Sequence, residues 1–211
     1  MRLFITFEGC EGSGKSTQIR KAGEFMKRMN VPAVVTCEPG GTELGRELRA
    51  ILLNKVSLSL AGKAEMLLFL ADRAQHVEEV IRPALETGKV VLCDRYADAT
   101  MAYQGYGRSL DAETIERFNA FATASLVPDK TFLFDLPAEV GMARASGRSR
   151  SGTAADRFEG ETLDFHRKIR EGYLDLARKH ARRFVVLNGQ GDVEDIHGEI
   201  CRHLNAFMSA R

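Results

Sequence analysis

The sequence predicts an α/β protein in which helices cover both faces of a five-stranded parallel sheet. Two observations predict this fold class. Short apolar runs alternate with segments of helical periodicity along the whole chain, and the first apolar run leads directly into a glycine-rich loop followed by a helix. We expect a single domain over residues 1–211, because this length suits one substantial core and no repeat or linker interrupts the alternation. In such a three-layer sheet, ligands gather at the carboxyl ends of the strands.

Five short runs have the apolar, β-branched composition of strands in a parallel sheet covered on both sides. The third run is apolar throughout and continues directly into Asp94, Arg95 and Tyr96. The end of that strand is therefore a candidate ligand-binding position. In chain order, we expect strands at 3–7, 33–37, 90–93, 131–136 and 184–187.

Helical periodicity fills the segments between these strands. Thr42 is the expected N-cap of the second helix, and Pro83 falls inside the long third helix, where it would produce a kink or a separate turn. Residues 147–152, rich in Gly, Ser and Arg, are expected to be flexible. The expected helices cover 17–29, 42–53, 63–86, 100–106, 111–124, 139–145, 160–181 and 193–208.

Composition excludes several classes of protein. A formal net charge of +1 provides no overall field for nucleic acid or an anionic membrane, and no apolar run is long enough to span a bilayer. The four cysteines have no metal-site spacing, and no signal peptide precedes the first strand. We therefore expect a soluble cytoplasmic protein with reduced cysteines, which binds neither nucleic acid nor membrane.

The loop after the first strand matches the pattern G-x-x-x-x-G-K-[ST] at every fixed position. Strand, glycine loop and helix together direct backbone N–H groups and a helix N-terminus at phosphate oxygens. In this arrangement Lys15 would reach the β- and γ-phosphates, and the Ser16 hydroxyl would coordinate Mg²⁺. The chain is thus expected to bind a nucleoside triphosphate through Gly9, Cys10, Glu11, Gly12, Ser13, Gly14, Lys15, Ser16 and Thr17.

A second group of polar residues is a candidate acceptor site. Asp94 could hold Mg²⁺ through water while Arg95 clamps a phosphate, or the two could form an internal ion pair. Phe69 and Arg73 share a helix face, where a ring could stack on a base and a guanidinium could bind its edge. From the residues alone, Phe69 is more often a core residue and Arg73 a solvated charge.

Several segments together resemble those of the bacterial thymidylate kinases. The P-loop is shared by many nucleotide-binding proteins, whereas the E-P-G-G-T and D-R-Y…A-Y-Q-G-Y blocks, in this order and spacing, are specific to that family. The resemblance covers nearly the whole chain. It is carried by residues 7–17, 38–42, 68–73, 94–96, 102–106, 128–129 and 156–159.

This resemblance implies a P-loop kinase fold with a mobile lid at about residues 146–158, a homodimer, and transfer of the γ-phosphoryl of ATP to dTMP with Mg²⁺. It implies that Phe69 stacks on thymine and that Glu11 contacts the sugar hydroxyl. The implied dTMP-binding residues are Glu11, Glu38, Arg49, Phe69, Arg73, Arg95, Thr100, Tyr103 and Gln104, the catalytic residues are Lys15, Arg95, Arg148, Arg150 and Arg157, and the metal-binding residues are Ser16 and Asp94.

Two features distinguish this chain within the family it resembles. Gly12 follows Glu11, and the lid carries several arginines, which is typical of members that supply cations from the lid. Cys37 stands where the family usually has Arg before E-P-G-G-T, so a cation near the acceptor is missing. Cys37 could be a reactive thiol or a small residue at a strand end.

Other functions are compatible with a P-loop. The protein could phosphorylate dUMP, dCMP or UMP instead, or it could be a nucleotide-dependent switch or a structural subunit. The absence of N-K-x-D and the intact P-loop count against the last two.

Overall fold

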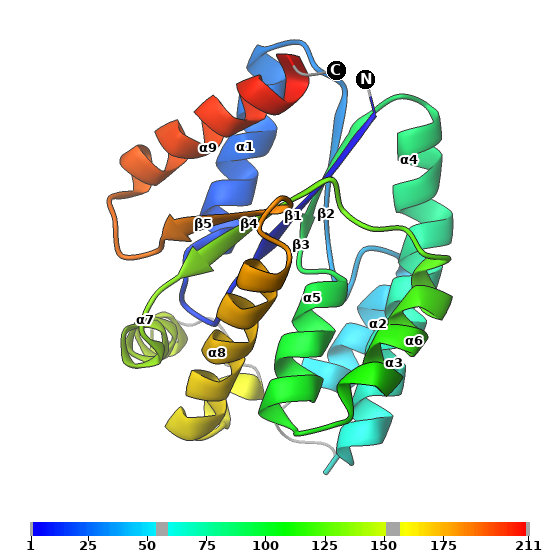
Figure 1. Cartoon of the computed structure of the whole chain (residues 1–211), viewed down its shortest axis with the longest axis vertical. Helices are drawn as coiled ribbons and strands as arrows, with labels where there is room; N and C mark the ends of the chain where they lie inside the picture. Colours follow the sequence, from blue (N-terminus) through cyan, green and yellow to red (C-terminus); the bar gives the residue numbers. More distant parts are fainter. Residues whose placement is uncertain (1, 54–58, 151–156, 210–211) are drawn as a thin grey trace.

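The computed structural model describes residues 2–53, 59–150 and 157–209, with the backbone alone for residues 148–150. Across these residues, five strands form one parallel sheet in the order β2-β3-β1-β4-β5 (Figure 1). The predicted fold class is confirmed, and each predicted strand is present within one residue at either end. The strands are β1 Leu3–Glu8, β2 Ala33–Cys37, β3 Val90–Asp94, β4 Lys130–Asp135 and β5 Phe184–Asn188.

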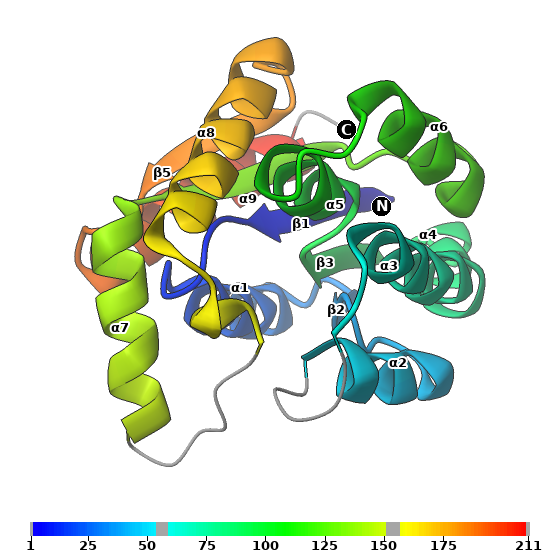
Figure 2. The ribbon, with the colours of Figure 1, turned by 90° about the horizontal axis from the view of Figure 1, so that it is seen from below.

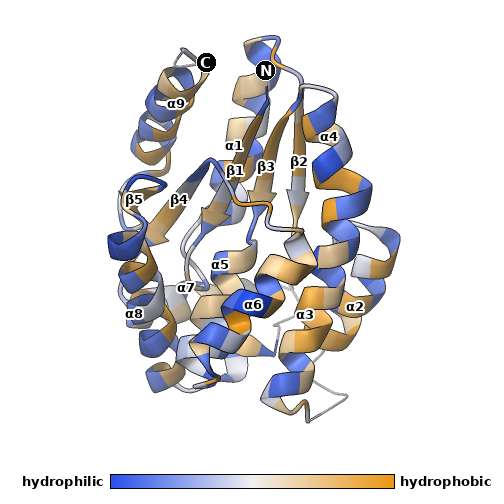
Figure 3. Cartoon of the chain, turned by 45° about the vertical axis from the view of Figure 1, so that its right-hand side comes forward, coloured by the Kyte–Doolittle hydropathy of each residue, from blue (hydrophilic) through white to orange (hydrophobic). Residues whose placement is uncertain are grey.

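Helices cover both faces of the sheet because successive strand residues point to opposite sides. Alternate residues of β1 such as Ile5 and Phe7 pack against α1 (Lys15–Arg28) and α9 (Val193–Ser209), while Phe4 packs with η1 (Val77–Ile81), α4 (Arg82–Glu86) and Tyr96. Figure 3 shows that the helices carry both hydrophilic and hydrophobic residues, whereas β1 and β3 are largely hydrophobic. Burial of this apolar surface stabilises the sheet from both sides.

Two of the predicted helices, 63–86 and 100–106, contain a π-helical turn. The helical elements otherwise follow the predicted order. They are α1 Lys15–Arg28, α2 Glu43–Leu53, α3 Gly62–His76, η1 Val77–Ile81, α4 Arg82–Glu86, α5 Ala97–Thr100, η2 Met101–Gly107, α6 Ala112–Thr123, α7 Ala138–Arg150, η3 Phe158–Gly160, α8 Leu163–Lys179 and α9 Val193–Ser209. The predicted helix 63–86 is divided by the π-helical turn η1, and Pro83 lies in the first turn of α4. The predicted cap is confirmed, since Thr42 Oγ1 accepts the Gly45 N–H at 2.9 Å.

The glycine- and arginine-rich stretch differs from the prediction. Helix α7 continues through Gly147 to Arg150, where we expected flexible chain from 147 to 152. A single glycine costs a helix only about 1 kcal/mol, and arginine is a good helix former, so the composition did not end the helix. Gly152, the last residue of the stretch expected to be flexible, lies outside the described residues.

The register of the sheet brings together the sites expected at its carboxyl end. Phe7 and Cys37 both pair with Asp94, so the P-loop, the loop after β2 and Arg95 begin side by side. Figure 2 looks onto this end of the sheet, which α2, α3, α5, α7 and α8 surround. Across the described ranges, no helix has both the length and the apolar character needed to cross a membrane.

Candidate active site

The P-loop turns sharply between β1 and α1, and its glycines permit the turn. Gly12 has φ of 71° and Gly14 has φ of 89°, which L-residues with a Cβ rarely adopt. A Cβ on Gly12 would also lie 2.1 Å from the carbonyl oxygen of Gly141 in α7. The loop therefore packs closely against α7, and any residue other than glycine would displace one of them.

The two polar residues that end the P-loop have different partners. Lys15 Nζ donates to the Gly9 and Cys10 carbonyl oxygens, both at 2.9 Å, so it lies inside the loop that a phosphate would enter. Burial lowers the pKa of Lys15, and the nearby Arg95 cation lowers it further. Ser16 Oγ donates to Asp94 Oδ2 at 3.1 Å, which joins the two residues predicted to bind a metal. A hydroxyl and a carboxylate are the oxygen ligands that Mg²⁺ prefers.

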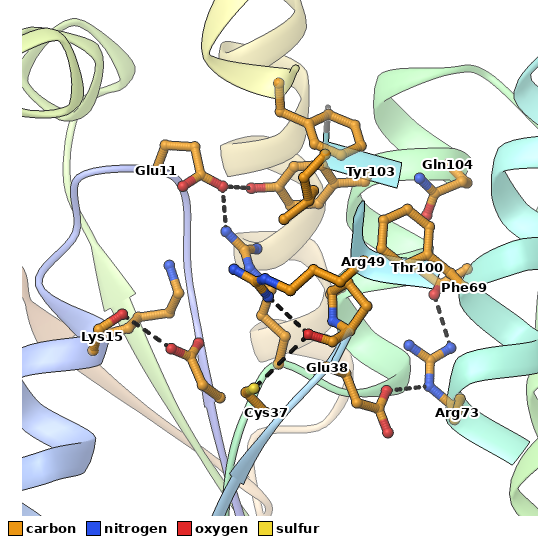
Figure 4. Close-up of a pocket in the computed structure, with 17 residues that line it drawn as sticks. Glu11, Lys15, Cys37, Glu38, Arg49, Phe69, Arg73, Thr100, Tyr103 and Gln104 are labelled. Atoms are coloured by element: carbon orange, nitrogen blue, oxygen red, sulfur yellow. Dashed lines mark hydrogen bonds and ion pairs between the residues drawn. The ribbon is translucent and has the colours of Figure 1, made fainter. Parts of the chain in front are cut away.

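A pocket opens next to the P-loop, between the ends of β2 and β3 and the helices α3 and η2 (Figure 4). The pocket is lined by predicted site residues and by residues that include Cys37, Pro39 and Phe158. The predicted site residues along its wall come from six separate segments of the chain. They are Glu11, Lys15, Ser16, Glu38, Arg49, Phe69, Arg73, Asp94, Arg95, Thr100, Tyr103 and Gln104.

Arg95 and Glu11 form an ion pair between the end of β3 and the P-loop. The Arg95 guanidinium also lies over the Tyr103 ring at 4.8 Å, and the Tyr103 hydroxyl donates to Glu11 at 2.9 Å. Burial alone would raise the pKa of Glu11, but Arg95 and Lys15 outweigh it and lower that pKa to about 2. Glu11 is therefore an anion that only accepts hydrogen bonds.

A buried carboxyl group, that of Glu8, is linked to Arg95 through the side chain of Tyr173. The sequence did not single out Glu8. Glu8 accepts the Tyr96 N–H at 2.7 Å and the Tyr173 hydroxyl at 2.8 Å. Tyr173 in turn accepts a hydrogen bond of 3.4 Å from Arg95. Burial, and then the charge of Asp98, raise the pKa of Glu8 to about 8. Glu8 immediately precedes the P-loop glycine, and that position was the only signal available.

Arg73 has more partners than a base-binding residue needs. Its side chain is almost fully buried and donates to Glu38 at 2.8 Å, Thr100 at 2.8 Å, Asn119 at 2.7 Å and the Tyr96 carbonyl at 3.0 Å. These bonds occupy four of the five N–H groups of a guanidinium. Arg73 therefore holds the pocket together as well as lining it, which the sequence did not predict.

Glu38 is fixed from its other side by a histidine that the sequence analysis missed. His76 Nδ1 lies 2.9 Å from Glu38 Oε1, and His76 Nε2 lies 2.7 Å from Thr36 Oγ1. His76 follows Arg73 by three residues in α3, so the two side chains share a helix face. That spacing was the signal that could have identified it.

Gln104 and Arg157 meet at one buried carboxylate. Gln104 Nε2 donates to Glu65 Oε1 at 2.7 Å, and Arg157 Nη2 donates to Glu65 Oε2 at 2.6 Å. Arg157 also donates to the Leu52 carbonyl at 3.0 Å, and it does not line the pocket. The side chains of the other predicted lid residues, Arg148 and Arg150, lie outside the described residues.

Cys37, where the sequence departs from the pattern it otherwise resembles, lies in the pocket wall near Arg49. Arg49 Nη1 donates to the Pro39 carbonyl at 2.7 Å, which brings a guanidinium from α2 to the pocket wall. Burial raises the pKa of the Cys37 thiol, so it stays protonated and is a weak nucleophile. The alternative of a small residue at a strand end therefore describes Cys37 better than a reactive thiol does.

A P-loop beside a pocket lined by Lys15, Arg49 and Arg95 is typical of the class of P-loop nucleotide kinases. A sequence-family model described as thymidylate kinase matches residues 7–200. The chain is 50% identical to a thymidylate kinase of Syntrophus aciditrophicus, over 98% of this chain and 96% of that one. It is 49% identical to one of Desulfovibrio desulfuricans, over 99% and 98%.

A solved structure agrees with these relatives. The crystal structure of thymidylate kinase from Ehrlichia chaffeensis superposes with a TM-score of 0.79 at 32% identity, and the match covers 97% of this chain and 98% of that one. The chain belongs to the thymidylate kinase family. The reaction of that family is the ATP-dependent phosphorylation of dTMP to dTDP.

Proposed function

We propose that this chain transfers the γ-phosphoryl group of ATP to dTMP across the junction between the P-loop and the pocket of Figure 4. The observation that carries the proposal is that pocket, because it combines a ring, a buried amide and guanidinium groups next to Lys15. The acceptor is a phosphate oxygen that is already anionic, so the reaction needs little general-base catalysis. Holding two polyanions in line and neutralising their charge supplies most of the rate.

The base of dTMP would lie against Phe69, with Arg73 and Gln104 at its edge and Thr100 beside it. Phe69 is half-buried and lines the pocket, so its ring is available for stacking. Arg73 retains one N–H after its four bonds, and that donor suits a carbonyl oxygen of the base. A site that hydrogen-bonds the base edge rejects bases that leave its polar groups unpaired.

The phosphate and sugar of dTMP would contact the residues nearest the P-loop. Arg95 and Arg49 would bind the phosphate, because both residues line the same pocket. Glu11 would accept a hydrogen bond from the 3′-hydroxyl. Tyr103 donates to Glu11, so its ring would lie beside the sugar, where a 2′-hydroxyl would be crowded.

ATP would bind through the P-loop, with its adenine near the loop at 188–192 that follows β5. Lys15 would leave its carbonyl partners for the β- and γ-phosphates, and Arg157, Arg148 and Arg150 would neutralise charge from the lid. Ser16 and Asp94 would hold Mg²⁺, which would offset the negative charge of the phosphate groups. Closure of the lid would exclude water as a competing acceptor.

We also propose a homodimer formed through α3 and α6. Leu67 on α3 is 52% exposed, and Phe121 on α6 is 86% exposed. The two helices pack side by side, so these apolar groups lie on neighbouring elements (Figure 3). Leu70, on the same helix as Leu67, is buried inside the subunit. Sedimentation equilibrium should give twice the chain mass, and Phe121→Asp should shift the mass toward that of one chain.

Acceptor choice tests the proposed reaction. ADP release from MgATP should be measured with dTMP, dUMP, dCMP and dGMP in turn. We expect dTMP to give the highest kcat/KM. A higher value for dUMP or dCMP would assign the chain to another nucleoside monophosphate kinase, and ATP binding with no acceptor-dependent ADP release would indicate a switch.

A further inference from the structure

Glu65 is a buried carboxylate with four hydrogen bonds from three side chains. It lies in the first turn of α3 and has no exposed surface. Arg157 donates to Oε2 at 2.6 Å, and Arg108 lies 3.2 Å from Oε2 and 3.4 Å from Oε1. Gln104 Nε2 donates to Oε1 at 2.7 Å. Glu65 does not line the pocket, whereas Gln104 does.

This arrangement fixes which end of the Gln104 amide faces the pocket. A carboxylate paired with two guanidinium groups can only accept hydrogen bonds, and an amide can bind it only through its N–H₂ group. If the amide turned over, two oxygen atoms would face each other in a buried site, and the carboxylate would lose a donor. Glu65 therefore holds the nitrogen of Gln104, which fixes the orientation of the amide and leaves its carbonyl oxygen as the acceptor available to a ligand.

We infer that Glu65 is a positioning residue that makes the pocket select pyrimidines with a protonated N3. The inference rests on the proposed function, in which Gln104 lies at the edge of the base. Thymine and uracil carry an N3–H that donates to the Gln104 carbonyl oxygen. Cytosine presents an unprotonated N3 acceptor, so two acceptors would face each other and dCMP would be rejected.

A merely structural role for Glu65 makes a different prediction. If Glu65 only anchors Arg108 and Arg157, its loss would lower the activity on dTMP and on dCMP by the same factor. A role in orienting Gln104 changes the ratio between the two acceptors. The ratio of kcat/KM for dTMP to kcat/KM for dCMP, measured with MgATP on the purified protein, therefore separates the two roles.

The first test compares Glu65→Gln with a matched control. A glutamine at this position can donate as well as accept, so Gln104 is free to turn over and present its N–H₂ group to cytosine. We expect the ratio to fall by at least about tenfold, with an increase in kcat/KM for dCMP. Glu161→Gln makes the same charge change on the other carboxylate that binds Arg108, at 2.6 Å, and should leave the ratio unchanged. A folded Glu65→Gln protein with an unchanged ratio would overturn the inference.

Two further variants keep the test decisive. Glu65→Asp retains the charge for the arginines but withdraws the acceptor from Gln104, so the ratio should fall again even if Glu65→Gln does not fold. Gln104→Ala removes the amide itself and should also lower the ratio. If Gln104→Ala leaves the ratio unchanged, the proposed base contact is wrong. If Gln104→Ala lowers the ratio and both Glu65 variants keep it, only the inference about Glu65 is wrong.

Discussion

Arg95 and Glu11 are paired across the junction between the strand β3 and the P-loop, at the point where the acceptor phosphate would enter. The pair connects the two halves of the site, and Tyr103 contacts both members. An incoming phosphate would compete with Glu11 for Arg95, because both are anions that a guanidinium binds in a bidentate manner. Glu11 would then be available to the sugar hydroxyl.

Glu11→Gln tests whether Glu11 contacts the sugar. A neutral amide accepts a weaker hydrogen bond than a carboxylate, so kcat/KM for dTMP should fall by about tenfold. The protein itself should prefer dTMP to 3′-deoxythymidine monophosphate, since the latter lacks the hydroxyl. Glu11→Gln should lose most of that preference. A preference that survives the substitution would place the sugar hydroxyl elsewhere.

Lys15→Ala should lower kcat by on the order of a hundredfold, because the cation offsets charge on the transferring phosphoryl group. The measurement is the steady-state rate of ADP release with saturating dTMP. Lys27 lies on the same helix and is exposed, so Lys27→Ala is a matched control that should keep normal turnover. Near-normal turnover of Lys15→Ala would exclude Lys15 from the transfer step.

Arg73→Ala should destabilise the protein as well as weaken the use of dTMP. The substitution removes the Arg73 donor from the buried side chains of Glu38 and Asn119, and breaking a buried ion pair costs about 3–5 kcal/mol. Denaturant unfolding should show that loss. Arg20→Ala breaks an exposed pair with Glu24 and should cost at most about 1 kcal/mol. Equal costs for the two variants would contradict the structural role of Arg73.

Glu8 should make the stability of the protein depend on pH. Its pKa is 4.5 in an unfolded chain and about 8 in the folded one, where burial is opposed by Arg95 and by the hydrogen bonds from Tyr173 and Tyr96. Between these values the folded state holds a proton that the unfolded state has lost. The free energy of unfolding should therefore fall as the pH rises from 5 to 8, by up to about 1.4 kcal/mol per pH unit.

Glu8→Gln keeps the shape of the side chain and removes this titration. Denaturant unfolding of both proteins at pH 5, 6, 7 and 8 gives the difference between their unfolding free energies. The advantage of the unsubstituted protein over Glu8→Gln should shrink steadily across this range. Parallel pH profiles for the two proteins would show that Glu8 does not titrate there.

Periodicity predicted the sheet well because buried parallel strands carry a continuous apolar signal. Val90 to Cys93 reads as a strand from composition alone, and the register then places Asp94 and Arg95 beside the P-loop. The helix limits were less accurate. The π-helical turns η1 and η2 keep the periodicity of a helix nearly unchanged, so the sequence gives no sign of the extra residue per turn.

The pocket was predicted through motifs, and its supporting groups were missed because they belong to no pattern of their own. Glu65 lies 39 residues from Gln104, and Asn119 lies 46 residues from Arg73. Only the fold brings such pairs together, and a buried carboxylate looks like a surface residue in the sequence. The same limit applies to Arg157, whose pairing with Glu65 could not be read from its motif.

A crystal structure of the protein with dTMP and MgADP tests the central claim most directly. We expect the dTMP phosphate on Arg95, with the Arg95–Glu11 pair broken, and the thymine ring against Phe69 with its N3–H on Gln104. An intact Arg95–Glu11 pair with the nucleotide bound away from Phe69 would contradict the account.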